Sequence, residues 1–295
     1  MATLQTSENN NEDYHEMEET GINVAEDEED VEKPDFPVDL ALEQQKKRWV
    51  LIRAVVGELL CTFLFVYIVC ATTVNFKMIP GSSSVVGGAL STAFSAVALI
   101  YSFADISGAH FNPAVTFATC VTRRTSITKG LLYIFAQMVG SVFSALIILA
   151  TFPGNIDPSL TGGRPGNAAA AAAVEPSKSA NIGNVFLTEL ILTFILVYVI
   201  FAVAFDTVDD NKNVKVVRGG KKAGNNLTIY TTSGATKAGF APIAIGFTLG
   251  FLCLLGGSVS GGAFNPARVF GPALVGNRWS RHWLYWIADF LGAVE

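Results

Sequence analysis

Charged residues are scarce in this sequence of 295 residues, since Asp, Glu, Lys and Arg together make up 15% where soluble domains carry about 25%. Histidine is rarer still, with only His15, His110 and His282. The four cysteines lie in apolar segments without the short spacings that bind zinc. The sequence shows no spacing of a nucleophilic residue and a basic residue that is typical of a catalytic site. The composition therefore predicts no metal site, no cofactor and no enzyme, and it favours a membrane protein.

Basic residues are almost missing from the N-terminal part of the chain. Fifteen of the 25 acidic residues lie in Met1–Glu43, where Lys33 is the only basic residue. A polar segment with few aromatics cannot bury enough apolar surface to fold. We therefore expect residues 1–46 to form a disordered acidic cytoplasmic tail and residues 47–295 to form the folded domain.

Long apolar stretches occupy the rest of the chain, and a helix that spans a bilayer needs about 20 such residues. The predicted spans are Trp49–Thr73, Val85–Ala104, Leu131–Phe152, Val185–Phe205, Phe240–Val259 and a short last one, Trp283–Val294. Two apolar pieces, Asn112–Val121 and Asn265–Leu274, are too brief to cross alone. The connections Pro153–Asn184 and Asp206–Lys237 are predicted to be loops.

The distribution of Lys and Arg over the connections predicts the orientation. Six spans place both termini on one side, and the segments of that side carry 14 basic residues against six on the other. The positive-inside rule assigns the richer side to the cytoplasm. We expect a multi-pass protein with both termini cytoplasmic, in the plasma membrane or an intracellular vesicle membrane.

The chain contains an internal repeat. The Glu-x-x-x-Thr-Phe pattern at Glu58 recurs at Glu189, and Ser107–Ala114 recurs as Ser260–Ala267. Each copy, about 49–152 and 184–295, holds three spans, and this odd number inverts the second copy in the membrane. Inverted repeats place the functional site near the bilayer midplane. We expect an all-α membrane protein with six transmembrane helices and two re-entrant half-helices.

Two Asn-Pro-Ala motifs mark the predicted starts of the half-helices, because Asn favours the N-cap and Pro the first helical position. Two such N-termini facing one pore, each with about half a positive charge, would repel cations including protons. The Asn side chains would donate to a file of water and the carbonyls of residues 107–111 and 260–264 would accept. One motif alone predicts only a capped helix, whereas two in an inverted repeat predict a pore. The motifs are Asn112, Pro113, Ala114 and Asn265, Pro266, Ala267.

These motifs resemble those of the aquaporin, or major intrinsic protein, channels. The resemblance covers about Lys47–Val294 and rests on Ser-Gly-Ala-His-Phe-Asn-Pro-Ala, Asn-Pro-Ala-Arg and the paired Glu-x-x-x-Thr helices. It implies the aquaporin fold, a homotetramer and one pore in each subunit. The implied partners are water, small neutral solutes and the lipid bilayer, and no nucleic acid is expected.

The resemblance also implies a selectivity filter. Arg268 directly follows the second motif, and the matching arginine lines the outer constriction in this family. Spacing from the motifs adds Thr92, Cys253 and Gly262. In the same way, the resemblance places His110 on the cytoplasmic side of the pore, although a histidine packed within its loop is the alternative.

The solute range stays open at this point. Water-selective members resemble one another in having Phe and His where this chain has Thr92 and Cys253, so a wider opening that admits glycerol or urea is expected. Phe65 or Phe94 could fill that space. Ala273 and the pair Tyr285-Trp286 resemble the water subclass instead.

Two carboxyl groups lie inside predicted spans, and such groups are functional candidates by default. For Glu58 and Glu189 we favour a structural role, in which each accepts backbone N–H groups of the adjacent re-entrant segment, over a proton relay. A membrane enzyme is the alternative from another class, and a closed-pore junction protein is the alternative within the family.

The connection Asp206–Lys237 has 32 residues, whereas helix connections in compact bundles need about 2–8. The distance from the Glu to the Asn-Pro-Ala motif is 54 residues in the first copy and 76 in the second. We expect this loop to gate the cytoplasmic pore mouth, with Tyr230 as the candidate plug. The alternative is a solvated insertion without influence on flux.

Overall fold

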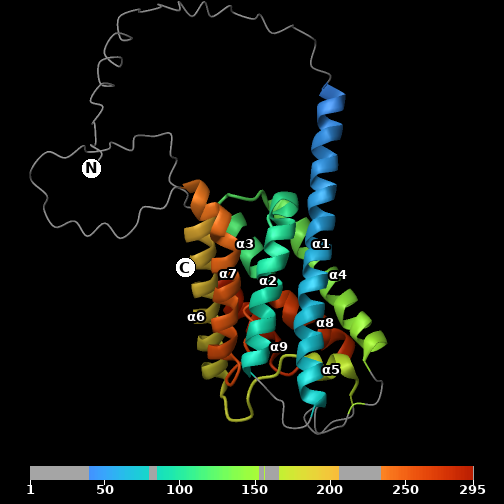
Figure 1. Cartoon of the computed structure of the whole chain (residues 1–295), viewed down its shortest axis with the longest axis vertical. Helices are drawn as coiled ribbons and strands as arrows, with labels where there is room; N and C mark the ends of the chain where they lie inside the picture. The colour runs from blue at the N-terminus through green and yellow to red at the C-terminus, as the bar shows by residue number, and fades with distance from the viewer. Residues whose placement is uncertain (1–39, 80–84, 153–155, 157–165, 206–233, 295) are drawn as a thin grey trace, which may run out of the picture. The chain divides into compact units, whose positions relative to one another are not determined.

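The computed structural model describes Leu40–Ile79, Val85–Phe152, Ile156, Gly166–Phe205 and Gly234–Val294 (Figure 1). Within these ranges every regular element is helical, as the sequence predicts. The predicted tail up to residue 39, residues 206–233 of the predicted loop and the candidate plug Tyr230 lie outside the described residues. The chain divides after Glu43 into two units, and the packing described below is that of Gln44–Glu295.

Five helices are long and apolar enough to cross a bilayer in the described part of the chain: α1, α2, α4, α6 with its extension η2, and α7. The short helices α3 and α8 follow the two Asn-Pro-Ala asparagines, and α9 has 11 residues where the sequence predicts a short last span. The elements are α1 (Leu40–Met78), α2 (Val85–Ser107), α3 (Pro113–Val121), α4 (Ile127–Thr151), α5 (Ala168–Ala172), α6 (Ile182–Ile200), the π-helical η2 (Phe201–Phe205), α7 (Gly234–Gly256), α8 (Pro266–Gly276) and α9 (His282–Gly292).

The starts of α3 and α8 have the local chemistry that the motifs predict. Asn112 Oδ1 accepts the N–H of Ala114 at 2.9 Å, and Asn265 Oδ1 accepts those of Ala267 at 3.0 Å and Arg268 at 3.3 Å. Each asparagine has extended backbone angles, and proline occupies the first helical turn. Both half-helices therefore begin where an N-cap and a proline require them to begin.

Three predicted boundaries differ from the structure. Helix α1 begins at Leu40 instead of after residue 46, because Leu40–Arg48 consists of strong helix formers that need no buried partner. The connection predicted as the loop Pro153–Asn184 contains α5, a run of alanines capped by Asn167, and its last residues begin α6. Helix α7 begins at Gly234, so the last residues of the predicted loop 206–237 are helical.

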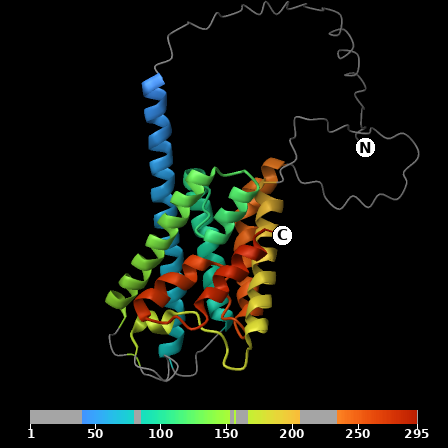
Figure 2. The ribbon, with the colours of Figure 1, turned by 180° about the vertical axis from the view of Figure 1, so that it is seen from behind.

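Small residues let the long helices of the bundle approach one another closely. Gly140 on α4 lies against the backbone of Leu59 on α1, and Gly292 on α9 lies against the backbone of Leu190 on α6. These two contacts occupy equivalent places in the two repeats. Figures 1 and 2 show α3 in the half of the bundle near the start of α4 and α8 in the opposite half, where it contacts α5.

Candidate functional site

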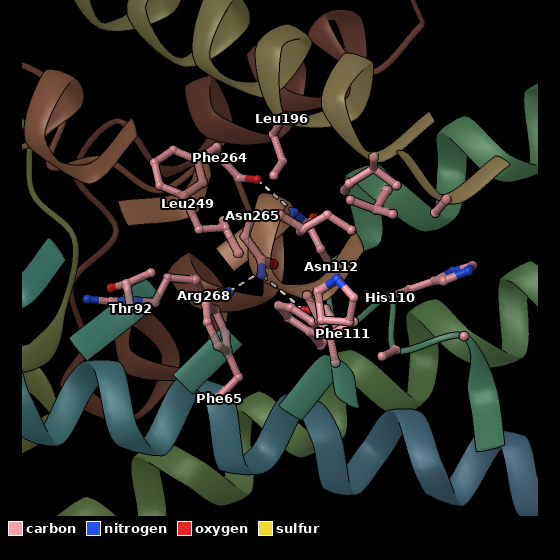
Figure 3. A pocket seen from close by; sticks show the side chains of 18 of the residues that line it. Phe65, Thr92, His110, Phe111, Asn112, Leu196, Leu249, Phe264, Asn265 and Arg268 are labelled. Carbon is pink, nitrogen blue, oxygen red and sulfur yellow. Dashed lines mark hydrogen bonds between the residues drawn. The ribbon is translucent and has the colours of Figure 1, made fainter. Parts of the chain in front are cut away.

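The two re-entrant segments meet through a reciprocal pair of hydrogen bonds. Asn112 Nδ2 donates to the carbonyl of Phe264 at 2.8 Å, and Asn265 Nδ2 donates to the carbonyl of Phe111 at 3.0 Å (Figure 3). An Asn amide nitrogen carries two hydrogens, so each side chain keeps one donor for another partner. The crossed bonds hold the two helix N-termini face to face.

The backbone before each motif adopts a left-handed conformation. The φ angle is 35° at both Phe111 and Phe264 and 49° at Ala109. Such angles in residues other than glycine cost about 1–3 kcal/mol each and persist only where the surroundings enforce them. The buried carboxyl groups of α1 and α6 supply that enforcement.

Glu58 on α1 is fully buried and accepts four hydrogen bonds. Its Oε1 accepts the hydroxyl of Ser107 at 2.6 Å and the N–H of His110 at 2.9 Å. Its Oε2 accepts the N–H of Phe111 at 2.8 Å and the side-chain amide of Gln137 at 2.8 Å. One carboxyl group thus binds three residues of the first re-entrant segment.

Glu189 on α6 has the equivalent place in the second repeat and is also fully buried. It accepts the N–H groups of Ala263 at 3.0 Å and Phe264 at 2.6 Å. Both glutamates make the backbone contacts expected of a structural role.

The carbonyls at the ends of the two predicted rows have donors within the protein. Tyr133 donates to the carbonyl of Ser107 at 2.7 Å, and Tyr285 donates to the carbonyl of Ser260. The carbonyls of Phe111 and Phe264 accept the two motif asparagines, as described above. The first and last carbonyls of the rows 107–111 and 260–264 therefore already accept one donor within the protein, and each keeps a second lone pair.

A cavity of about 170 Å³ runs past both motifs. One water needs about 10–15 Å³ of such space, so a file of several waters fits. The polar side is backbone and amide from Gly108–Asn112 and Gly262–Asn265. The opposite walls are apolar and come from α1, α2, α6 and α7, through Phe65, Val69, Ile100, Leu196, Ile245 and Leu249.

All four predicted filter residues, Thr92, Cys253, Gly262 and Arg268, line this cavity. Arg268 is 8% exposed, and its Nη1 donates to the carbonyl of Ala172 at the end of α5 at 3.1 Å. It is therefore held inside the protein and does not extend along the lipid surface.

Helix α5 is a feature that the sequence reading missed. Besides Arg268, it binds Lys77 of α1, whose Nζ donates to the carbonyl of Ala171 at 2.6 Å. Two cationic side chains thus converge on neighbouring carbonyls at its C-terminal end, where the helix dipole is negative.

Other predicted positions separate into those that line the cavity and those that do not. His110 lines it, with Nδ1 at 3.1 Å from the hydroxyl of Thr116 and its ring edge-on to Tyr133. Phe65 lines it as well and packs on Phe111 with ring centroids 4.7 Å apart. Phe94 is 60% exposed on the outside of α2, so it does not fill the filter.

The end of the cavity predicted to face the cytoplasm involves the π-helical segment η2. Ala204 and Phe205 contribute to the lining there. The guanidinium of Arg124 lies 4.8 Å from the ring centroid of Phe205 and 5.6 Å from that of Phe201. A π-helical turn is rare and often marks a functional place.

Comparison with known proteins gives a consistent result. The family described as Major intrinsic protein matches residues 45–220 and 223–295. The chain is 69% identical over 288 residues to Aquaporin-B of Dictyostelium discoideum, covering 95% of this chain and 92% of that protein. It is 34% identical to an aquaporin of Vairimorpha ceranae, covering 84% of this chain and 94% of that protein.

Among solved structures, the fold is similar to the X-ray structure of the aquaglyceroporin from Plasmodium falciparum, with a TM-score of 0.62. The sequences are 21% identical, and the match covers 83% of this chain and 93% of that one. At this identity the likeness concerns the fold alone.

Proposed function

The chain belongs to the major intrinsic protein family of membrane channels, and we propose that it conducts water, passes small neutral solutes such as glycerol and urea, and excludes protons and ions. The observation that carries the proposal is that one cavity passes both Asn-Pro-Ala asparagines. This cavity supports an open channel over a closed-pore junction protein.

The exclusion of protons is supported by the arrangement of charge around Asn112 and Asn265. Helices α3 and α8 point their positive ends at the same part of the cavity. A water at this place accepts the free amide hydrogens, and its own hydrogens then point away from the midplane toward the remaining carbonyls. A hydrogen-bonded file that reverses direction at its centre does not relay a proton, and the dipoles oppose a cation.

The passage of glycerol or urea is supported by the small side chains of the filter. Thr92, Cys253 and Gly262 supply little bulk around Arg268, and Phe94 points away from them. The guanidinium of Arg268 can donate to a hydroxyl or to a carbonyl oxygen. The aromatic ring of Phe65 narrows the cavity beside Phe111.

The remaining parts of the proposal rest on the sequence. We propose a homotetramer with one pore in each subunit, both termini in the cytoplasm, and gating by residues 206–237. The bias of Lys and Arg toward one side supports the orientation.

Stopped-flow measurements on proteoliposomes of the full-length protein test the proposal. An osmotic step in sucrose reports water, inward gradients of glycerol and urea report the solutes, and a pH-sensitive dye in the lumen reports protons. We expect a fast water flux, a measurable flux of glycerol and of urea, and a proton flux no greater than in empty liposomes. Water flux equal to that of empty liposomes would overturn the channel, and fast water without glycerol or urea would overturn the wide filter.

A further inference from the structure

Several contacts that hold the two re-entrant segments recur in both repeats, but one buried position differs in its chemistry. Glu58 corresponds to Glu189, and Tyr133 corresponds to Tyr285, since each tyrosine bonds to the serine carbonyl of its own segment. Four residues after Tyr133 the first repeat has Gln137. Four residues after Tyr285 the second repeat has Asp289, so a carboxyl group replaces an amide at this position.

In the first repeat the amide acts as a donor. Gln137 Nε2 donates to Glu58 Oε2 at 2.8 Å and to the hydroxyl of Thr116 at 2.9 Å. Gln137 is fully buried. It donates to the same oxygen that accepts the backbone N–H of Phe111.

In the second repeat two acidic groups meet in the interior of the bundle. Asp289 on α9 and Glu189 on α6 are both fully buried, and the two helices pack closely here, since Gly292 lies against the carbonyl of Leu190. Asp289 Oδ1 accepts the hydroxyl of Thr193 at 3.3 Å. Among the described residues, no N–H or O–H donates to Asp289 Oδ2, and no Lys or Arg forms an ion pair with either carboxyl.

We propose that Asp289 holds a proton on Oδ2 and donates it to Glu189, so that a neutral carboxylic acid takes the place that the Gln137 amide has in the first repeat. Two adjacent carboxylates cannot both remain ionised in a buried site without a cation. A protonated carboxyl has one O–H donor and keeps an acceptor, which matches the two partners of Asp289.

The proton belongs to Asp289 because the oxygens of Glu189 already face donors. Glu189 Oε1 accepts the N–H of Ala263, and Oε2 accepts that of Phe264. Hydrogen bonds to the charged form stabilise the charged form. On Asp289, by contrast, one oxygen has a donor and the other has none.

Asp289 therefore acts as a positioning residue for the second half-helix. It does not line the cavity, and it acts through Glu189 on the Ala263–Asn265 turn that carries the second motif. This role rests on the proposed channel function, whereas the protonation state itself can be measured without any flux.

Infrared spectroscopy of the reconstituted full-length protein provides the direct test. We expect a carbonyl band of a protonated carboxylic acid that shifts when aspartate is isotopically labelled at its carboxyl carbon and is lost in Asp289→Asn. Absence of an aspartate-dependent band in the wild type, or an unchanged band in the variant, would overturn the proposal. A band with no water flux would overturn the channel function while leaving this inference intact.

Thermal unfolding of paired variants tests the positioning role. Asp289→Asn keeps a donor of similar shape, so we expect the unfolding temperature and the water permeability per channel to stay near those of the wild type. Asp289→Leu removes the donor, so we expect a downward shift and reduced permeability, as in the matched control Gln137→Leu. The role is refuted if Asp289→Asn lowers the unfolding temperature and the permeability as much as Asp289→Leu does. It is also refuted if Asp289→Leu matches the wild type in both while Gln137→Leu does not.

Discussion

Replacing Glu58 with glutamine removes one acceptor oxygen from the most heavily bonded side chain of the site. The remaining oxygen can keep two of the four donors. The new NH2 group would face the other two, which are the N–H of Phe111 and the amide of Gln137 if the Oε1 contacts are kept. If the Gln137 amide rotated so that its oxygen faced the new NH2 group, the hydroxyl oxygen of Thr116 would lose the hydrogen bond that it now accepts from Gln137 at 2.9 Å.

Each buried donor left without an acceptor costs about 1–3 kcal/mol. Two of them cost about 2–6 kcal/mol, which is a large part of the 5–15 kcal/mol that usually separates folded from unfolded domains. We therefore expect Glu58→Gln to lower the unfolding temperature of the purified protein strongly and to reduce water permeability per channel. The second effect follows because the left-handed turn at Phe111 loses the contact that enforces it.

Glu189→Gln serves as the matched variant. Its new amide can donate to Asp289, because a carboxylic acid can accept as well as donate, so about one backbone N–H of Ala263 or Phe264 loses its acceptor. We expect Glu189→Gln to lower the free energy of unfolding by about half as much as Glu58→Gln. Thermal unfolding in detergent measures the stability of the two variants, and swelling of proteoliposomes measures their water permeability. An unfolding temperature and a permeability of Glu58→Gln that both equal the wild type would refute the reasoning.

Three further predictions concern conduction. Mercurials should block water flux through Cys253, which is partly exposed to the cavity while Cys61 and Cys70 are fully buried, and block that persists in Cys253→Ser would assign it to another cysteine. Arg268→Ala should raise proton leakage, measured with a lumenal pH dye, because it removes a fixed positive charge from the cavity; unchanged leakage would contradict that role. Deleting the 22-residue excess within 206–237 should raise water permeability at equal surface expression, and equal permeability per channel would contradict the gate.

The sequence predicted the fold because its strongest signals are local and repeated. The half-helices α3 and α8 begin at the predicted prolines, since the asparagine caps and the prolines act within a single turn. The spans follow from apolar length. The boundaries of α1 and α7 were less predictable, because helix propensity alone can extend a helix beyond the segment that is buried.

The parts of the site that sequence reasoning missed depend on contacts between distant segments. The bond from Arg268 to Ala172 joins residues 96 positions apart, and an alanine run gives no side-chain signal for it. Gln137 and Asp289 could have been found by extending the repeat comparison past the motifs to Tyr133 and Tyr285. Their partners became visible only when the helices were brought together.

Helix α5 binds Arg268, a residue of the proposed selectivity filter, through a main-chain oxygen, and this affects how the protein can change over generations. Almost any side chain could replace Ala171 or Ala172 without deleting the acceptor, provided that the helical turn persists and the new group fits the buried space. Variation along this connection can therefore shift the placement of Arg268 by small backbone movements while the filter residues keep their identities. Permeability could drift between related channels with identical filters, and comparing filter letters alone would overlook the cause.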